Sequence, residues 1–201
     1  MGRPTDHTPR TQRMGLLGWL KRPRAGKNHQ IEAWRREWER AADTGDAAAV
    51  ASLRAALLAQ PPMAPDIEME QEMLEGLERL VALNEDLQAA RLPFVETTHR
   101  VVGADACHYS APVSMPEDAA QPSGRLLLTA TRAVFIGGAK LTAVPWHLAA
   151  KAFHGGRDVL IVRADGTAAY RFRCNSYADA LCGAALARHL IEAARERRGS
   201  R

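Results

Sequence analysis

The spacing of hydrophobic residues changes from helical to alternating near Pro93 and becomes helical again after Ser176. Before Pro93 apolar residues recur every three or four positions, which is typical of one face of an α-helix. After it, short apolar runs alternate with polar residues and are separated by turn residues, as in antiparallel strands. The pattern predicts an α+β protein, in which a helical subdomain over residues 29–92 precedes an antiparallel β-domain with a C-terminal helix over residues 93–201.

Three helices are predicted in the first part. The first carries Trp34 and Trp38 on one face, where aromatic residues usually belong to a core. Asp46 is placed to cap the second helix, whose expected apolar face consists of Val50, Leu53, Leu57 and Leu58. The third begins after Pro65 and carries glutamates spread along its faces, which indicates a solvated face or one docked on basic neighbours rather than a metal loop.

A β-hairpin is the sharpest local prediction. Asp165-Gly166 lies between two apolar runs and favours a two-residue turn with both residues at positive φ. This turn sets the cross-strand pairs, one face being apolar and the other carrying an opposite-charge pair. The predicted pairs are Ile161–Tyr170 and Val159–Phe172 on the apolar face, and Leu160–Arg171 and Asp158–Arg173 on the other.

The flanks of the β-domain are predicted from the same pattern. Residues 94–115 contain four valines and read as strand-like. At the other end, Ser176 followed by Asp179 resembles a capping box and predicts a helix that runs to about Arg197. One face of this helix is expected to lie over an open sheet, and that face consists of Leu181, Cys182, Ala185, Leu186, His189 and Leu190.

The net charge is only +4, but basic and acidic residues are concentrated in different parts of the chain. Residues 1–40 carry 10 basic and 4 acidic side chains, whereas residues 41–92 carry 3 basic and 10 acidic ones. Residues 124–201 carry 13 basic and 5 acidic ones, so the acidic middle is expected to pack against a basic part. Three cysteines favour a reducing compartment. A cytoplasmic protein is expected, with a peripheral position at the inner face of the membrane as an alternative.

Residues 1–28 are predicted to be a disordered basic tail with a short apolar segment at residues 14–20. Trp19 lies in that segment, beside the cations Lys21, Arg22, Arg24 and Lys27. This composition is typical of a segment that lies on an anionic membrane surface. Two alternatives stay open: an unattached basic tail, and a segment that docks on its own protein. Met14 is a second candidate for the natural start.

Catalytic chemistry is not indicated by any spacing in the sequence. Cys107 and His108 are adjacent, and neighbouring residues on a strand point to opposite faces, so they are poorly placed to act together. Metal-ligand spacings and a phosphate-binding loop are lacking, so we expect no enzyme, no cofactor and no metal. A nucleic-acid partner is not expected either, because the cations are not interleaved with aromatic residues, and no small-molecule substrate is identified.

Residues 124–138, followed by Lys140-Leu-Thr-Ala-Val-Pro-Trp-His-Leu, resemble the pleckstrin-homology-like superfamily, in particular its GRAM-like and bacterial members. The resemblance covers residues 106–197 and implies seven antiparallel strands in a bent, nearly closed sheet capped by the C-terminal helix. Phosphoinositide binders of this superfamily carry cations in the loop between the first two strands. The matching loop here holds Glu117 and Asp118, with no cation before Arg125, which argues against that site.

The superfamily includes lipid-binding, protein-binding and architectural members, so the fold alone does not fix a function. We expect a non-enzymatic adaptor that docks a protein partner, with Arg163, Arg171 and Arg173 as a basic surface for an acidic partner. That surface would alternatively receive the chain's own acidic helical subdomain. Two other functions remain open: peripheral binding to anionic phospholipid, and an enzyme with an unrecognised site.

Residues 14–27 are expected to associate weakly with anionic bilayers. Each of the four cations near such a surface contributes about 1 kcal/mol, or roughly 4 kcal/mol together, which supports reversible binding only. Deleting residues 1–27 should abolish sedimentation with acidic liposomes at low salt, and unchanged sedimentation would contradict this expectation.

Overall fold

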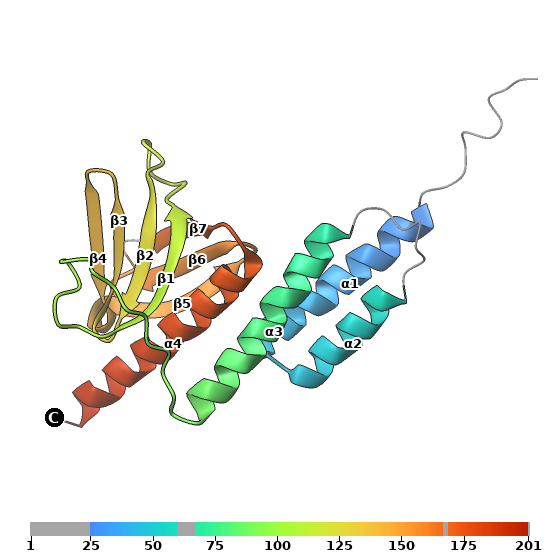
Figure 1. The fold of residues 1–201 in the computed structure, drawn as a ribbon, viewed down its shortest axis with the longest axis horizontal. Helices are drawn as coiled ribbons and strands as arrows, with labels where there is room; N and C mark the ends of the chain where they lie inside the picture. Colours follow the sequence, from blue (N-terminus) through green and yellow to red (C-terminus); the bar gives the residue numbers. More distant parts are fainter. Residues whose placement is uncertain (1–24, 60–66, 167–168, 201) are drawn as a thin grey trace, which may run out of the picture.

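The computed structural model describes residues 25–59, 67–166 and 169–200. This part of the chain forms a three-helix layer, a seven-stranded antiparallel sheet and a C-terminal helix that lies between them (Figure 1). The elements are α1 (Ala25–Thr44), α2 (Ala47–Leu58), α3 (Glu68–Gln88), β1 (Cys107–Ser114), β2 (Ser123–Thr129), β3 (Arg132–Gly137), β4 (Lys140–Pro145), a 3₁₀ turn (Trp146–Leu148), β5 (Ala149–Gly155), β6 (Asp158–Arg163), β7 (Ala169–Cys174) and α4 (Tyr177–Gly199). The predicted α+β class is confirmed, and the arrangement is consistent with a pleckstrin-homology-like fold.

The sheet has the strand order β4-β3-β2-β1-β7-β6-β5, with antiparallel neighbours throughout. The predicted hairpin register is confirmed between β6 and β7, where Val159 pairs with Phe172 and Asp158 with Arg173. The turn differs in detail from the prediction. Gly166 has a φ of +69°, but Asp165 is not among the described residues with positive φ, so the turn is not the predicted type.

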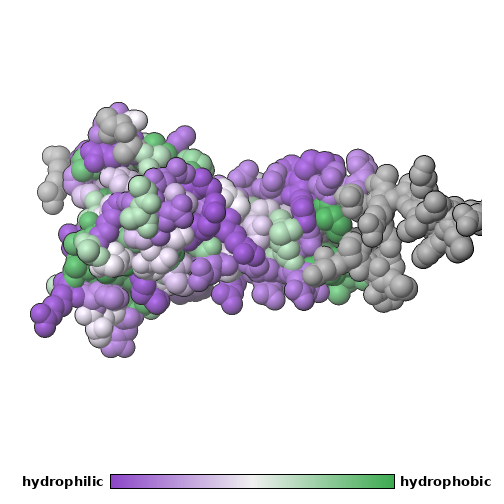
Figure 2. Space-filling model, turned by 90° about the horizontal axis from the view of Figure 1, so that it is seen from above, coloured by the Kyte–Doolittle hydropathy of each residue, from purple (hydrophilic) through white to green (hydrophobic). Residues whose placement is uncertain are grey.

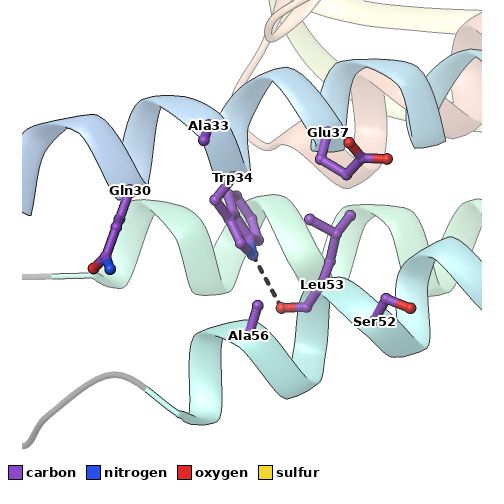
Figure 3. A pocket seen from close by; sticks show the side chains of 7 residues that line it. All are labelled: Gln30, Ala33, Trp34, Glu37, Ser52, Leu53 and Ala56. Atoms are coloured by element: carbon purple, nitrogen blue, oxygen red, sulfur yellow. Dashed lines mark hydrogen bonds between the residues drawn. The ribbon is translucent and has the colours of Figure 1, made fainter.

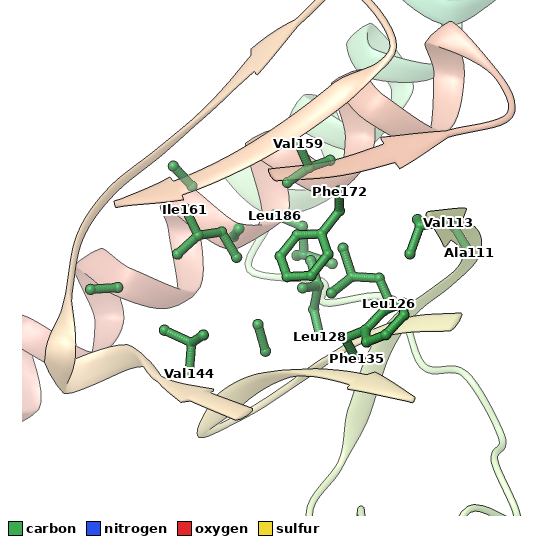
Figure 4. Close-up of a cluster of buried hydrophobic side chains, with 14 of the residues drawn as sticks. Ala111, Val113, Leu126, Leu128, Phe135, Val144, Val159, Ile161, Phe172 and Leu186 are labelled. Atoms are coloured by element: carbon green, nitrogen blue, oxygen red, sulfur yellow. The ribbon is translucent and has the colours of Figure 1, made fainter. Parts of the chain in front are cut away.

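The inner face of the sheet holds the main core of the β-domain. Alternate residues of the strands point inward and are buried against one face of α4, with Phe135 and Phe172 stacked at 6.1 Å between ring centroids. Figure 4 shows Val144 of β4 and Ile161 of β6, which lie far apart in the strand order, in this one core, because the sheet bends over itself.

The segment before β1 corrects the prediction that residues 94–115 are strand-like. Strand structure begins only at Cys107, and the preceding residues form a turn-rich crossing over the outer face of the sheet. Val102 is buried there with Cys107, Leu127 and Val134, and two further valines pack beside it. The valines therefore bury apolar surface by covering strands rather than by joining them.

Helix α4 begins as predicted, since the Ser176 hydroxyl accepts a hydrogen bond from the backbone N–H of Asp179 at 3.0 Å. The prediction of a single apolar face over the sheet is wrong. Leu186 and Leu190 face the sheet core, whereas Leu181 and Ala185 belong to a second core with α1, α2 and α3. The helical part is thus joined to the β-domain through α4.

Close approach along α4 depends on two glycines. A Cβ at Gly183 would lie 3.1 Å from the ring of Tyr109 in β1, and a Cβ at Gly76 in α3 would lie 3.1 Å from the backbone N of Ala178. These distances are tighter than ordinary side-chain packing, so glycine lets α4 approach the sheet on one side and α3 on the other. The Tyr109 hydroxyl also donates to the carbonyl oxygen of Asp179 at 2.8 Å.

The helical core is built around the two predicted tryptophans. Trp34 Nε1 donates to the carbonyl oxygen of Leu53 at 3.0 Å, and Trp38 Nε1 donates to that of Met73 at 2.6 Å. Asp46 caps α2 by accepting from the backbone N–H of Ala48 at 2.9 Å. Leu58 was predicted to be buried but is 80% exposed, because it follows buried Leu57 and so points about 100° away from it around the helix, outside the buried stripe of Val50, Leu53 and Leu57.

The junction between the two parts is aromatic and charged. Arg157, in the β5–β6 turn, pairs with Glu72 of α3 and lies over the Tyr177 ring at 4.9 Å. Trp38 packs edge-on against both Tyr177 and His154, with centroids 5.4 and 6.2 Å away. The acidic middle of the chain was expected to pack against a basic part, and at this junction α3 does so through the Glu72–Arg157 pair.

Because α4 is buried in both hydrophobic cores, we expect the helical part and the β-domain to unfold together. Leu181→Ala should lower the free energy of unfolding by about 2–5 kcal/mol through lost contacts and a cavity. Because Leu181 lies on the helix that both cores share, helix content and tryptophan fluorescence should report one coincident urea transition. Leu58→Ala, at an exposed position, should stay within about 0.5 kcal/mol of the parent. An earlier, separate transition of the helices in Leu181→Ala would contradict the shared-core interpretation.

Buried His154 predicts a loss of stability in mild acid. Its side chain is 11% exposed, and its ring nitrogens make no hydrogen bond with a described residue, although Asp43 Oδ1 lies 3.6 Å from Nε2. Burial lowers its pKa below the ordinary value of 6.5, although the carboxylates of Asp43 and Glu39 oppose this, and Arg188 adds to it. The unfolded chain then binds a proton that the folded chain does not, so stability present above pH 6.5 is lost as pH falls toward the folded pKa.

The pH dependence is checked by urea unfolding at pH 8 and pH 5.5. His154→Phe should reduce the decline, because its ring can keep the contact with Trp38 and binds no proton. His147→Phe, at an exposed position, should leave the decline in place because His154 is retained. Equal declines in the parent and in His154→Phe would refute this role.

Candidate docking surfaces

The predicted arginine surface lies on the outer face of β6 and β7. Arg171 and Arg173 flank buried Phe172 and point away from the core, as expected from strand alternation. Asp158 lies between them and is buried. Arg171 Nε donates to Asp158 Oδ2 at 2.6 Å, and Arg173 Nε donates to Asp158 Oδ1 at 2.9 Å. We call these three residues the Asp158 cluster.

The cluster holds one carboxylate between two guanidinium groups. Burial favours the protonated acid, but the hydrogen bonds from Arg173 and Arg171 outweigh it and hold the pKa of Asp158 below its ordinary value. Asp158 is therefore ionised at neutral pH and leaves one net positive charge on the cluster. The two arginine side chains remain 35% and 52% exposed.

A second carboxylate reaches the cluster from the β1–β2 loop. Arg171 Nη1 donates to Glu117 Oε1 at 2.9 Å, and the neighbouring Asp118 pairs with Lys140 of β4. Both acidic residues of this loop thus contact cations of the sheet. Glu117 is 66% exposed, so its contact with Arg171 is a surface ion pair, which typically contributes little to stability.

Arg163 is not part of the cluster. Alternation along β6 places it on the face opposite to that of Asp158, and its guanidinium pairs with Asp165 of the following turn at 2.9 Å. The structure therefore brings together two of the three predicted arginines. The sequence pattern could have separated Arg163, since it lies an odd number of residues from Asp158.

The alternative that these arginines receive the chain's own acidic helices does not match the contacts. Acidic residues of α3 pair with Arg35, Arg54 and Arg157. The ion-pair partners of Arg171 and Arg173 in the described part of the chain are Asp158 and Glu117, both from the β-domain. The Asp158 cluster thus faces outward.

A groove between α1 and α2 is a second surface, and sequence reasoning missed it. Its volume is about 420 Å³, and Figure 3 shows its lining side chains coming from these two helices alone. Trp34 and Leu53 form the buried floor, and small or polar exposed residues form most of the walls. The lining residues are Gln30, Ala33, Trp34, Glu37, Ser52, Leu53 and Ala56.

The predicted membrane-surface residues Trp19, Lys21, Arg22 and Arg24 lie outside the described residues. Lys27 falls within α1, which begins at Ala25 rather than after residue 28. A truncation that stops at residue 24 therefore keeps this helix whole. In the described part of the chain no helix is long and apolar enough to cross a bilayer.

Cys107 and His108 have separate partners. His108 Nδ1 lies 2.7 Å from the carbonyl oxygen of Pro93, and the Cys107 thiol donates to the carbonyl oxygen of Tyr109 at 3.2 Å. All three thiols are free. Burial raises the pKa of Cys174 to about 12 and that of Cys182 to about 11, so both are protonated and weakly nucleophilic at neutral pH.

Metal binding is not supported by the described residues, which contain no group of three or more His, Cys, Asp or Glu side chains placed to hold an ion.

The chain matches no protein-family model and no curated protein. Solved structures with weak similarity include Inner Membrane Complex Sub-compartment Protein 3 from Toxoplasma gondii, which is 12% identical over 43% of this chain and 77% of that one, with a TM-score of 0.35. The C-terminal domain of an unknown protein from Leishmania infantum is 13% identical over 59% of this chain and 98% of that one, with a TM-score of 0.37.

The linker-DH/PH domains of p115-RhoGEF are 8% identical over 61% of this chain and 42% of that one, with a TM-score of 0.40. At these identities and TM-scores the similarities carry no argument about function. The fold assignment rests on the strands, their order and the capping helix of the chain itself.

Proposed function

We propose that this protein is a non-enzymatic docking module that binds an acidic segment of a protein partner through the Asp158 cluster. The observation that carries the proposal is the sharing of one buried carboxylate by two partly exposed guanidinium groups. Asp158 fixes both arginines side by side, so less side-chain entropy is lost when they bind a further carboxylate. We also propose that the β-domain is a GRAM-like or bacterial pleckstrin-homology-like domain.

Donor groups remain for a partner. Nη1 of Arg173 makes no hydrogen bond with any described residue, and Nη1 of Arg171 is held only by exposed Glu117. A guanidinium group accepts carboxylates in a bidentate geometry. A partner's glutamate or aspartate can therefore bind Arg173 directly and replace Glu117 on Arg171.

A protein partner is favoured over a phospholipid headgroup by the β1–β2 loop. Lipid binders that this domain resembles present cations from that loop, whereas here Glu117 and Asp118 pair with Arg171 and Lys140. The loop therefore supplies no cation of its own for a phosphate, and its carboxylates occupy two cations of the sheet. The acidic partner we propose instead competes with a single exposed ion pair.

The proposal is tested with Asp158→Asn, Arg171→Gln and Arg173→Gln combined. Charge reversal of the arginines alone would leave Asp158 buried and unpaired, so it would lose stability whether or not a partner binds there. The triple variant keeps polar groups at all three positions. Its affinity for a fluorescein-labelled octaglutamate peptide at low salt should fall about tenfold or more, as measured by fluorescence polarisation.

The matched control combines Glu196→Gln, Arg197→Gln and Arg198→Gln at the exposed end of α4. It removes the same charges, two positive and one negative, and should leave the affinity nearly unchanged. Circular dichroism melting confirms that both variants are folded. Equal losses in the two variants would mean diffuse attraction, and a folded triple variant that binds like the parent would refute the docking site.

A further inference from the structure

The α1–α2 groove lies within reach of the apolar segment that precedes α1. Its lining residues on α1, namely Gln30, Ala33, Trp34 and Glu37, follow one helical face over the first turns after Ala25. Gln30 lies about 8 Å along the helix axis from Ala25. Residues 21–24 can span roughly 13 Å when extended, so residues 14–20 can turn back onto this face.

Apolar side chains are exposed where this segment joins the fold. Figure 2 shows hydrophobic side chains exposed at the end of the helical part that is farthest from the sheet. In Figure 1 this is the end at which α1 begins and α2 finishes. The groove volume of about 420 Å³ lies within the range of pockets that hold a bulky apolar group.

Residues 14–20 have the composition that such a groove accepts. They include Leu16, Leu17, Trp19 and Leu20 within seven positions. The groove offers the methyl groups of Ala33 and Ala56 as walls above Trp34. We propose that residues 14–20 of the same chain occupy the α1–α2 groove, with Trp19 inserted between Ala33 and Ala56. The indole would then pack against Trp34, whose own N–H is already bonded to Leu53.

Occupation by the chain itself gives the groove a regulatory consequence. An apolar segment held between α1 and α2 cannot insert into a bilayer or bind another protein at the same time. The four cations that follow it, Lys21, Arg22, Arg24 and Lys27, would stay at the mouth of the groove. This surface is separate from the Asp158 cluster, so the inference stands or falls independently of the proposed function.

The linker between α2 and α3 is the nearest competing occupant. Leu58 and Ile67, which lie near its two ends, line a different hollow of about 230 Å³ between α2 and α3. The linker is thus better placed for that hollow than for the α1–α2 groove. The remaining competitor is the same segment from a second copy of the chain.

The experiment uses the full chain labelled with ¹³C and ¹⁵N, studied by NMR. Nuclear Overhauser effects are expected between the Trp19 indole and the methyl groups of Ala33 and Ala56. Ala55→Gln changes an exposed neighbour on α2 that does not line the groove, and should retain the Trp19–Ala33 effects. Ala56→Gln narrows the groove and should abolish them, while the Trp34 indole signal stays in place as a check of folding.

A second variant tests the segment itself. Leu17→Asp should shift the amide signals of Ala33, Leu53 and Ala56 and leave those of the sheet unchanged. The absence of Trp19 contacts with the groove in the parent protein would overturn the proposal. So would contacts found only between differently labelled chains in a mixed sample, because the occupant would then be a second copy.

Discussion

Helix α4 has to fill two hydrophobic cores at once, and the rest of the molecule is arranged around that requirement. Leu186 and Leu190 face the sheet, while Leu181 and Ala185 face α1, α2 and α3. A helix buried on both sides must be narrow where its neighbours approach, and the alanines along α4 together with Gly183 and Gly76 provide that narrowness. The helical part therefore packs on the β-domain through α4.

The segregated charges of the chain are used largely inside the fold. Acidic α3 pairs with Arg35, Arg54 and Arg157, the last of which lies at the junction with the sheet. Buried Asp158 similarly binds two arginines on the neighbouring strand. The basic excess of residues 124–201 thus overstates the positive charge that the β-domain offers to a partner, and the positions of the carboxylates decide where donors remain.

The two candidate surfaces differ in physical character. The Asp158 cluster is held in place by charge and by a shared hydrogen-bond acceptor, so it suits a carboxylate ligand. The α1–α2 groove exists because small side chains face each other across two helices above Trp34, so it suits an apolar ligand. A charged partner and an apolar segment can therefore be bound at separate places without competing for the same groups.

The sequence by itself determined the elements whose signals are local. Turn chemistry and face alternation gave the Val159–Phe172 and Asp158–Arg173 pairs, and capping residues located the starts of α2 and α4. Periodicity identified Trp34 and Trp38 as core residues, because a buried face repeats at the helical period regardless of what covers it.

Only the tertiary structure decided what each face packs against. Residues 94–106 carry strand-like valines, yet they cover the sheet, because burial satisfies valine equally well in a crossing segment and in a strand. The spacing placed Leu181 and Ala185 on the same face of α4 as Leu186 and Leu190, and only the packing shows that the first pair faces the helices and the second pair faces the sheet. The α1–α2 groove likewise could not be predicted from the sequence, because its volume depends on the distance between the two helices and not on the order of residues in either.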